Sequence, residues 1–498
     1  MSSKRSLPGS RSLPRGHRTN PSHRGVTPHS ARPSAGGRTA PVTVLAAVIV
    51  SSILLVGLLS GGPAWAQTGV PAGGSPAGGA AGTSAPADLN QATRAAIVDS
   101  VSAVLDSVYV FPETATRMEA LIHDNLRKGE YDRILALPDF TRRLTEDLRS
   151  ISHDGHITVT PLPPAPPPGM PAPSPEDQRK AYLETKAREN YGFAKVEHLG
   201  GNVGYLDLRE FADAGIAGKT AVAAMTLLGN SDALIFDLRK NGGGDPSMIQ
   251  LLCSYLFPEP THLNDFHLRR GNQVWQFWTP TNVAGPDLSK VPVWVLTSSY
   301  TFSGAEEFTY NLKTLKRATI VGETTGGGAH PINSYAYPAL GVGINVPFGR
   351  AVNPITGTNW EGTGVEPDLK VSAADALGVA HIAALKALRA QTTVPEQALA
   401  LGWIQEGLEL SARPIALDAA ALGAYEGSYG PRRAWVEDGT LYYQRAPQSR
   451  VRLIPVGNDT FFLDGVDYFR VRFGREGDRI TKLIGMYQDG RVSENPRD

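Results

Sequence analysis

From about residue 192 the chain alternates short apolar segments with stretches of helical periodicity, and no other feature limits the fold as much. The apolar segments are predicted as strands, and their sequences are VGYLDL, ALIFDL, PVWVLT and ATIVGE. Helix-like stretches lie between them, including AGKTAVAAMTLLG and PSMIQLLCSYLF. Because strands that alternate with helices favour parallel pairing through crossover helices, the sequence predicts an α/β domain with a mainly parallel sheet over residues 192–392.

The regions on either side of this domain have different patterns. Residues 89–160 show helical periodicity and end in ITVT, whose β-branched residues suggest a strand. Residues 161–191 begin with PLPPAPPPGMPAPSP and are predicted as a Pro-rich linker. Residues 415–498 contain short apolar segments between glycine and Asp-Gly turns, which indicates a small antiparallel β domain, either a barrel or a sandwich. Several domains also agree with the length of 498 residues, which is too great for one compact core.

The first 66 residues are basic and then apolar, as in a secretory signal peptide. They contain one Lys, seven Arg and no Asp or Glu, and an apolar stretch precedes small residues at Ala64 and Ala66. Residues 42–59 are also near the length that spans a bilayer, so an uncleaved membrane anchor is the alternative. In both cases we expect the rest of the chain to be exported, to the periplasm or the extracellular space, behind a flexible tether at residues 67–88.

Charge and cysteine content exclude some classes of protein. After residue 66 the chain has 40 basic and 48 acidic residues, and no cluster of Lys and Arg occurs there. Because phosphate contacts need such clusters, we expect no nucleic-acid partner. The single cysteine, Cys253, excludes an intramolecular disulfide and a cysteine-based zinc site. Its apolar neighbours predict a packed side chain and no reactivity.

The stretch TSSYTFSGAEEF, between a predicted strand and a predicted helix, contains the first candidate for chemistry. Its residues 303–306, SGAE, match the S-x-x-E capping box, so one interpretation makes Ser303 an ordinary helix cap. The same position also suits a nucleophile, because the turn exposes the hydroxyl and the helix N-terminus favours negative charge. The local pattern leaves both interpretations open.

A serine nucleophile needs a base within hydrogen-bond reach, and SHDGH offers two histidines, His153 and His156. His156 follows Asp-Gly at the start of a predicted strand, where a tight turn can hold the imidazole outward. Two histidines in four residues could also suggest a metal site, but no third ligand with matching spacing stands nearby. We therefore expect no metal, and the serine chemistry requires no organic cofactor.

Two other segments are rich in glycine. FDLRKNGGGD ends a predicted strand with Gly242, Gly243 and Gly244, whose bare backbone N–H groups suit an oxyanion hole at the edge of a sheet. A phosphate loop is excluded because G-x-x-x-x-G-K-[ST] is absent, while a plain turn remains an alternative. NWEGTGVEPDLKV places Glu361 before a turn, where most glutamates are solvated.

The order of these motifs resembles peptidase family S41 over about residues 90–390. The motifs are SHDGH, YLDLREF, FDLRKNGGGD, TSSYTFSGAEEF, IVGETTGGG and GTGVEPD. That family includes the tail-specific, C-terminal processing proteases, the tricorn core protease and the interphotoreceptor retinoid-binding protein. The resemblance implies a ClpP/crotonase-like catalytic domain and a serine peptidase that acts on polypeptides.

The resemblance also implies which residues act. Ser303 matches the nucleophile of the family's S-x-x-E element. The tail-specific branch uses a lysine base in a segment that corresponds to GETTGGGAH, and Gly328 stands at the place of that lysine. This departure points to the tricorn-like and retinoid-binding-protein-like branch, whose base is a histidine. That histidine maps to His156 and its acidic partner to Glu361, with His330 as a second candidate base.

The expected oxyanion donors are the backbone N–H groups of Gly304 and Gly243. The tail-specific branch carries a PDZ domain between its helical region and its sheet, and the 161–191 interval is too short for one. The favoured function is an exported serine peptidase. A non-catalytic module that binds an apolar ligand on the same fold, or an esterase or amidase that uses the same residues, are the alternatives.

Overall fold

The computed structural model describes residues 89–163, 171 and 173–498. The predicted signal peptide or anchor and the tether lie outside these residues, as does part of the Pro-rich linker. Among the residues described, no helix is both long enough and apolar enough to cross a membrane. The predicted membrane-spanning stretch 42–59 is not among them.

Three helices near the start of the described chain pack against a small antiparallel sheet. The helices are α1 (Gln91–Val108), α2 (Pro112–Arg127) and α3 (Leu137–Ser152). Strand β1 (Thr158–Pro161) pairs with β10 (Val342–Pro347), which pairs with β9 (Ile332–Tyr337). One apolar core joins these helices and strands, and β10 contributes Val342, Ile344 and Val346 to it. The predicted helical region is therefore completed by a hairpin from the middle of the predicted catalytic domain.

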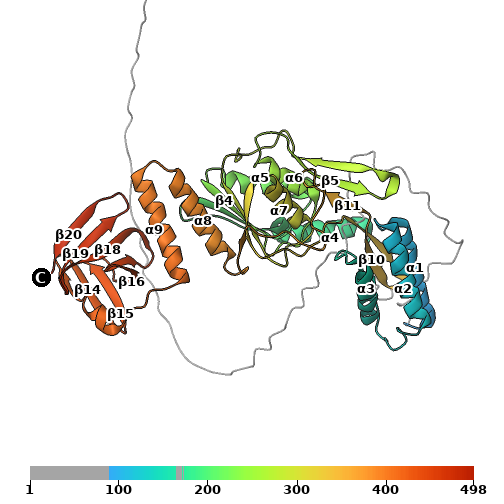
Figure 1. The fold of residues 1–498 in the computed structure, drawn as a ribbon, viewed down its shortest axis with the longest axis horizontal. Coiled ribbons are helices and arrows are strands. Elements are labelled where there is room, and N and C mark those ends of the chain that lie inside the picture. The colour runs from blue at the N-terminus through green and yellow to red at the C-terminus, as the bar shows by residue number, and fades with distance from the viewer. Residues whose placement is uncertain (1–88, 164–170, 172) are drawn as a thin grey trace, which may run out of the picture. The chain divides into compact units, whose positions relative to one another are not determined.

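A six-stranded sheet forms the centre of the predicted catalytic domain (Figure 1). Its strand order is β12–β8–β7–β4–β3–β2, and only β2 and β3 are antiparallel neighbours. The strands are β2 (Phe193–Leu199), β3 (Val203–Leu208), β4 (Ala233–Asp237), β7 (Val293–Thr297), β8 (Ala318–Gly322) and β12 (Leu369–Lys370). The predicted α/β class with a mainly parallel sheet is confirmed.

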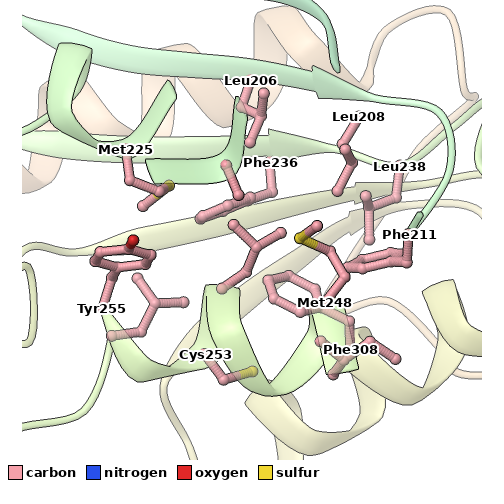
Figure 2. Packing of buried hydrophobic residues seen from close by; sticks show 14 of the residues in the cluster. Leu206, Leu208, Phe211, Met225, Phe236, Leu238, Met248, Cys253, Tyr255 and Phe308 are labelled. Carbon is pink, nitrogen blue, oxygen red and sulfur yellow. The ribbon is translucent and has the colours of Figure 1, made fainter. Parts of the chain in front are cut away.

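Side chains on this sheet alternate between two cores, because successive residues of a strand point to opposite faces. Leu206 and Phe236 belong to the core on one face (Figure 2), whereas Tyr205 and Ile235 belong to the core on the other. Cys253 is buried in the first core, as its apolar neighbours predicted, and burial raises the pKa of its thiol. The first core contains α5 (Ala214–Leu227), α6 (Pro246–Ser254) and α7 (Gly304–Thr314), and the second contains α8 (Ala376–Gln391) and α9 (Pro395–Ala412).

A further sheet positions the segment that leads to the site. It has the order β11–β5–β6, with β5 (His262–Leu268), β6 (Val274–Trp278) and β11 (Gly349–Val352). The Ala351 N–H of β11 donates a hydrogen bond to the Ala329 carbonyl (3.2 Å). Phe266 of β5, Ala329 and Trp360 share one small apolar core, so this sheet supports the residues on either side of Ala329 and Trp360.

Helix α4 (Pro175–Arg188) lies inside the range predicted as a linker. It begins with a capping box: the Ser174 hydroxyl accepts a hydrogen bond from the Asp177 N–H (3.1 Å), and the Asp177 carboxylate accepts one from the Ser174 N–H (3.2 Å). The predicted linker therefore contains a helix in addition to its proline run.

The C-terminal region is an antiparallel meander that comes close to a closed barrel. Each strand pairs with the next, and the Asp498 N–H donates to the Ser428 carbonyl (3.0 Å), which joins the two ends of the sheet. The short helix α10 (Ala419–Gly423) precedes it. Its strands are β13 (Gly427–Tyr429), β14 (Arg432–Glu437), β15 (Thr440–Arg445), β16 (Val451–Gly457), β17 (Thr460–Leu463), β18 (Val466–Glu476), β19 (Arg479–Tyr487) and β20 (Val492–Pro496). The predicted antiparallel β domain is confirmed.

Candidate active site

Ser303 occupies a strained turn between β7 and α7. Its backbone has φ 53° and ψ −122°, in the left-handed half of conformational space that residues other than glycine rarely enter. Such strain persists only where the surrounding structure holds it, and it concentrates at functional sites. Serine nucleophiles on strand-to-helix turns use this kind of backbone because it exposes the hydroxyl. Ser303 is at the N-cap position of α7, as the capping box predicted, and its role as a nucleophile stays a prediction.

The buried carboxylate of Glu306 holds this turn against the following glycine-rich loop. It accepts hydrogen bonds from the backbone N–H groups of Ser303 (2.9 Å), Gly327 (2.7 Å) and Gly328 (2.8 Å), and a short one from the Thr325 hydroxyl. Burial raises the pKa of Glu306, and these four donors oppose that rise. The second half of the predicted capping box therefore also anchors residues 325–328.

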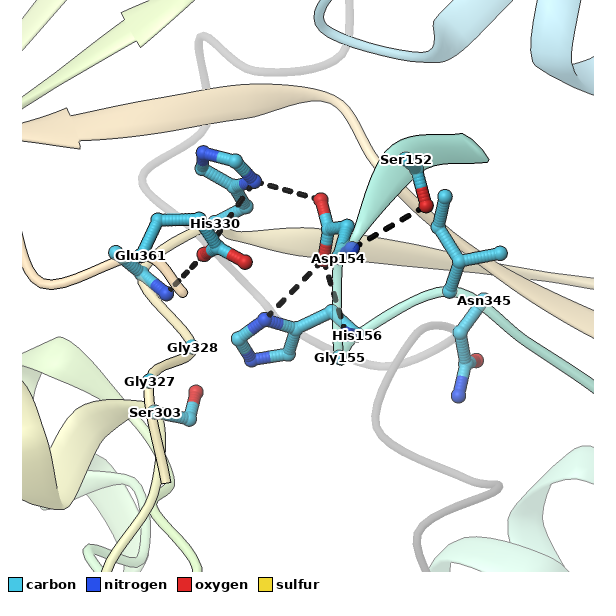
Figure 3. Close-up of polar contacts among 12 residues, drawn as sticks. Ser152, Asp154, Gly155, His156, Ser303, Gly327, Gly328, His330, Asn345 and Glu361 are labelled. Carbon is cyan, nitrogen blue, oxygen red and sulfur yellow. Dashed lines mark hydrogen bonds and ion pairs between the residues drawn. The ribbon is translucent and has the colours of Figure 1, made fainter. Parts of the chain in front are cut away.

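His156 lies just beyond α3, in a turn that Asp154 fixes. The Asp154 carboxylate accepts a hydrogen bond from the His156 backbone N–H (2.9 Å). The imidazole is only 8% exposed and packs on the Phe302 ring, with centroids 4.7 Å apart. Neither ring nitrogen has a hydrogen-bond partner among the described residues. Nδ1 lies 3.9 Å from Asp154 Oδ1, and the other ring nitrogen lies on the side of Ser303 (Figure 3).

The protonation of His156 follows from this burial. Loss of solvation lowers the pKa of the imidazole to about 4, although the negative charge of Asp154 raises it in part. The ring is therefore neutral at physiological pH, which is the form that can accept a proton.

Asp154 is a site residue that sequence reasoning missed. Its carboxylate is 1% exposed, shares a 2.6 Å hydrogen bond with His330 Nδ1, and accepts one from the Tyr109 hydroxyl (3.3 Å). Burial raises its pKa, but the hydrogen bond and charge of His330, with the charge of His156, hold the pKa below its usual value. The available signal was its place in SHDGH, where our interpretation used the histidines and passed over the aspartate.

Glu361 lies beside His330, and no described contact joins it to His156. Its Oε2 accepts a hydrogen bond from the Ala329 N–H (2.5 Å) and is 3.5 Å from His330 Nδ1. Burial raises the pKa of Glu361 to about 7, with His330 opposing the rise and Asp154 adding to it. Glu361 thus reaches His156 only through His330 and Asp154. Its direct partnership with the base stays a prediction.

Gly328 lies where a side chain would have no room. A Cβ added there would lie 2.2 Å from Phe302 Cζ and 2.7 Å from His156 Cε1. Non-bonded carbon atoms do not approach so closely unless the neighbouring atoms move. The Phe302 and His156 rings therefore fill the space that a side chain at residue 328 would need. The glycine at residue 328 and the buried position of the His156 ring therefore belong to one packing arrangement.

The glycines after β4 lie against Ser303. A Cβ added at Gly243 would lie 2.8 Å from Ser303 Cβ and 2.9 Å from Gly304 N. The Gly243 N–H already donates to Asn241 Oδ1 (2.8 Å). No described hydrogen bond occupies the N–H of Gly244 or of Gly304, so these two donors are free within the described chain. The role of Gly243 stays a prediction, with Gly244 as its neighbouring candidate.

We expect Gly328→Ala to lower the free energy of unfolding by about 1–3 kcal/mol, because the added methyl group overpacks the Phe302 and His156 rings. Gly378→Ala is the matched control, since Gly378 lies in α8 with no atom within 4 Å of the added Cβ. There the helix propensity of alanine should raise stability by about 0.5–1 kcal/mol. Denaturant unfolding measures both changes, and equal changes in the two variants would contradict the packing of Gly328.

Comparisons with known proteins find two family models that match this chain. Residues 202–371 match the family model for peptidase family S41, and residues 88–193 match the model for the N-terminal domain of this peptidase in eukaryotic IRBP. Together these matches cover more than half of the chain.

Several solved protease structures are similar to this chain, with low sequence identity. A putative S41 protease from Bacteroides fragilis is 22% identical, with 36% of this chain and 51% of that chain covered and a TM-score of 0.33. The alignment thus spans about half the length of that relative. The photosystem II D1 C-terminal processing protease is 16% identical, with coverages of 56% and 93% and a TM-score of 0.37. The tricorn protease is 13% identical, with coverages of 64% and 37% and a TM-score of 0.38.

The two family-model matches carry the assignment, and the predicted motifs lie within them: SHDGH within residues 88–193 and the other five within residues 202–371. The chain belongs to peptidase family S41.

Proposed function

We propose that this chain is an exported peptidase in which Ser303 attacks the carbonyl of a peptide bond and His156 accepts the serine proton. The observation that carries this proposal is the pairing of a strained Ser303 with a buried, neutral imidazole whose free nitrogen faces it (Figure 3). A helix cap alone would need neither the strained backbone nor the unpartnered ring.

The reaction divides into two transfers. Ser303 Oγ bonds to the carbonyl carbon as its proton passes to His156, and the resulting oxyanion accepts hydrogen bonds from Gly304 and one N–H of residues 242–244. The C–N bond then breaks as His156 gives its proton to the leaving amine. Water attacks the acyl-enzyme in the same way, with His156 again as base, and releases the second product and the free serine.

The two carboxylates support the base from different distances. Asp154 lies 3.9 Å from His156 Nδ1 and stabilises the imidazolium that forms after proton transfer. Glu361 acts on the same assembly through His330 and Asp154, in agreement with the role that its motif implies. His330 is a poorer candidate base because its Nδ1 is held by Asp154 at 2.6 Å.

In the chain of residues 67–498, Ser303 should react with a fluorophosphonate probe, because the neutral imidazole of His156 lies beside it (Figure 3). Ser303→Ala should abolish labelling, and His156→Ala should slow it by about 100- to 10,000-fold, as expected when a general base is lost. Ser299→Ala, which changes an exposed strand-end serine, should label like the parent protein. A folded parent protein that does not label would make Ser303 a helix cap only and would favour the binding-module alternative.

The pH profile of kcat/KM should report the ionisation of two buried side chains, His156 and Glu361. Since the pKa of His156 is about 4, the base stays neutral through the neutral range. Since the pKa of Glu361 is about 7, its carboxylate ionises there and the added negative charge should raise the rate as pH increases through 7. Glu361→Gln should remove this limb and leave only the one near pH 4. A limb near the ordinary imidazole value of about 6.5 that survives in Glu361→Gln would contradict the assignment.

Export is proposed from the basic and apolar N-terminal segment and the small residues at Ala64 and Ala66. Mass spectrometry of the protein from the exported fraction should find an N-terminus at Gln67 if the signal is cleaved. An intact N-terminus in the membrane fraction would support the anchor, and a purely cytosolic protein would contradict export.

A further inference from the structure

We propose that Asp154, His330 and Glu361, together with His156, bind a divalent transition-metal ion of the zinc class, and that this ion switches the peptidase off. Metal binding stands on geometry alone, whereas the inhibition rests on the proposed role of His156 as base. The sequence predicted no metal, because Asp154 was overlooked and His330 lies far from SHDGH along the chain.

Three ligand side chains converge at this place (Figure 3). Asp154, His330 and Glu361 each offer one ligand atom, and these atoms lie within 4.8 Å of one another. His330 Nδ1 is 2.6 Å from Asp154 Oδ2 and 3.5 Å from Glu361 Oε2. His330 is 5% exposed and the Glu361 side chain 16% exposed, so an ion held here would be largely removed from water.

A second observation points to a ligand beyond these hydrogen bonds. Both ring nitrogens of the buried His156 lack hydrogen-bond partners among the described residues, and Nδ1 faces Asp154. Glu361 Oε1 is also buried and lacks a partner. Buried polar atoms without partners are costly, and a cation would satisfy the imidazole nitrogen and the carboxylate oxygen together.

The donor set selects the class of ion. Two imidazoles and two carboxylates supply nitrogen and oxygen ligands that suit zinc, whereas magnesium and calcium prefer oxygen alone. The outer contacts also resemble those of metal sites, because the Ala329 N–H holds Glu361 Oε2 and the Tyr109 hydroxyl holds Asp154 Oδ2.

The expected inhibition follows from the different roles of the two nitrogens in the His156 ring. An ion on His156 Nδ1 leaves the proton on Nε2, the nitrogen on the side of Ser303. The ring then has no free electron pair to accept the serine proton. Removal of the ion by a chelator restores the neutral base, so the inhibition should be reversible.

The test titrates the tag-free chain of residues 67–498 with Zn²⁺ against a chromophoric chelator, and with Co²⁺ by visible absorption. We expect one ion per chain in the parent protein and in Ser303→Ala, which keeps every ligand. Glu361→Gln and His330→Gln should each weaken binding by at least about 10-fold. His262→Gln is the matched control, because His262 also pairs with a carboxylate, Asp265 (2.6 Å), but belongs to no described three-ligand cluster. Its affinity should not change.

Unfolding temperatures of all variants show whether a loss of binding reflects a loss of fold. No measurable Zn²⁺ binding by the parent protein, or unchanged affinity in folded Glu361→Gln and His330→Gln, would overturn the site and leave a hydrogen-bond network only. Zn²⁺ that binds without slowing peptide hydrolysis would overturn the inhibition. A parent protein that binds Zn²⁺ but never hydrolyses peptides would overturn the proposed function and the switch while the metal site stands.

Discussion

The buried carboxylate of Glu306 is the contact on which the arrangement of the site depends. A carboxyl group removed from water is tolerated only when hydrogen bonds replace its solvation, and four donors do so here. Three of these donors are backbone N–H groups, so the carboxylate fixes the course of the chain. It ties the strained Ser303 to Gly327 and Gly328, and Gly328 in turn leaves the room that His156 occupies.

The residues of the candidate site come from segments next to two different cores. Ser303 precedes α7, which packs on the central sheet, whereas Asp154 and His156 follow α3, one of the N-terminal helices. His330 precedes β9, whose hairpin with β10 enters the core of these helices. The candidate site therefore lies next to the segment that leads from the catalytic domain into the core of the N-terminal helices.

Local sequence patterns predicted features within single segments. They did not predict contacts between residues that are far apart in the sequence. The parallel strands were evident from short apolar runs, and Ser303 and His156 from motifs that carry their own turns. The Asp154–His330 hydrogen bond joins residues that are 176 positions apart, so the pattern of either segment alone does not predict the contact. Likewise, the engagement of the Gly243 N–H depends on the side chain of Asn241, which the glycine pattern does not specify.

The hairpin of β9 and β10 also has a consequence for how the chain can be divided. Without residues 89–161, β10 would lose its partner β1 and expose Val342, Ile344 and Val346 along an open edge. Open apolar edges pair readily with other chains, so an isolated fragment of residues 192–392 would be prone to aggregate. A truncated version of the chain should therefore keep the N-terminal helices and β1 together with the hairpin of β9 and β10.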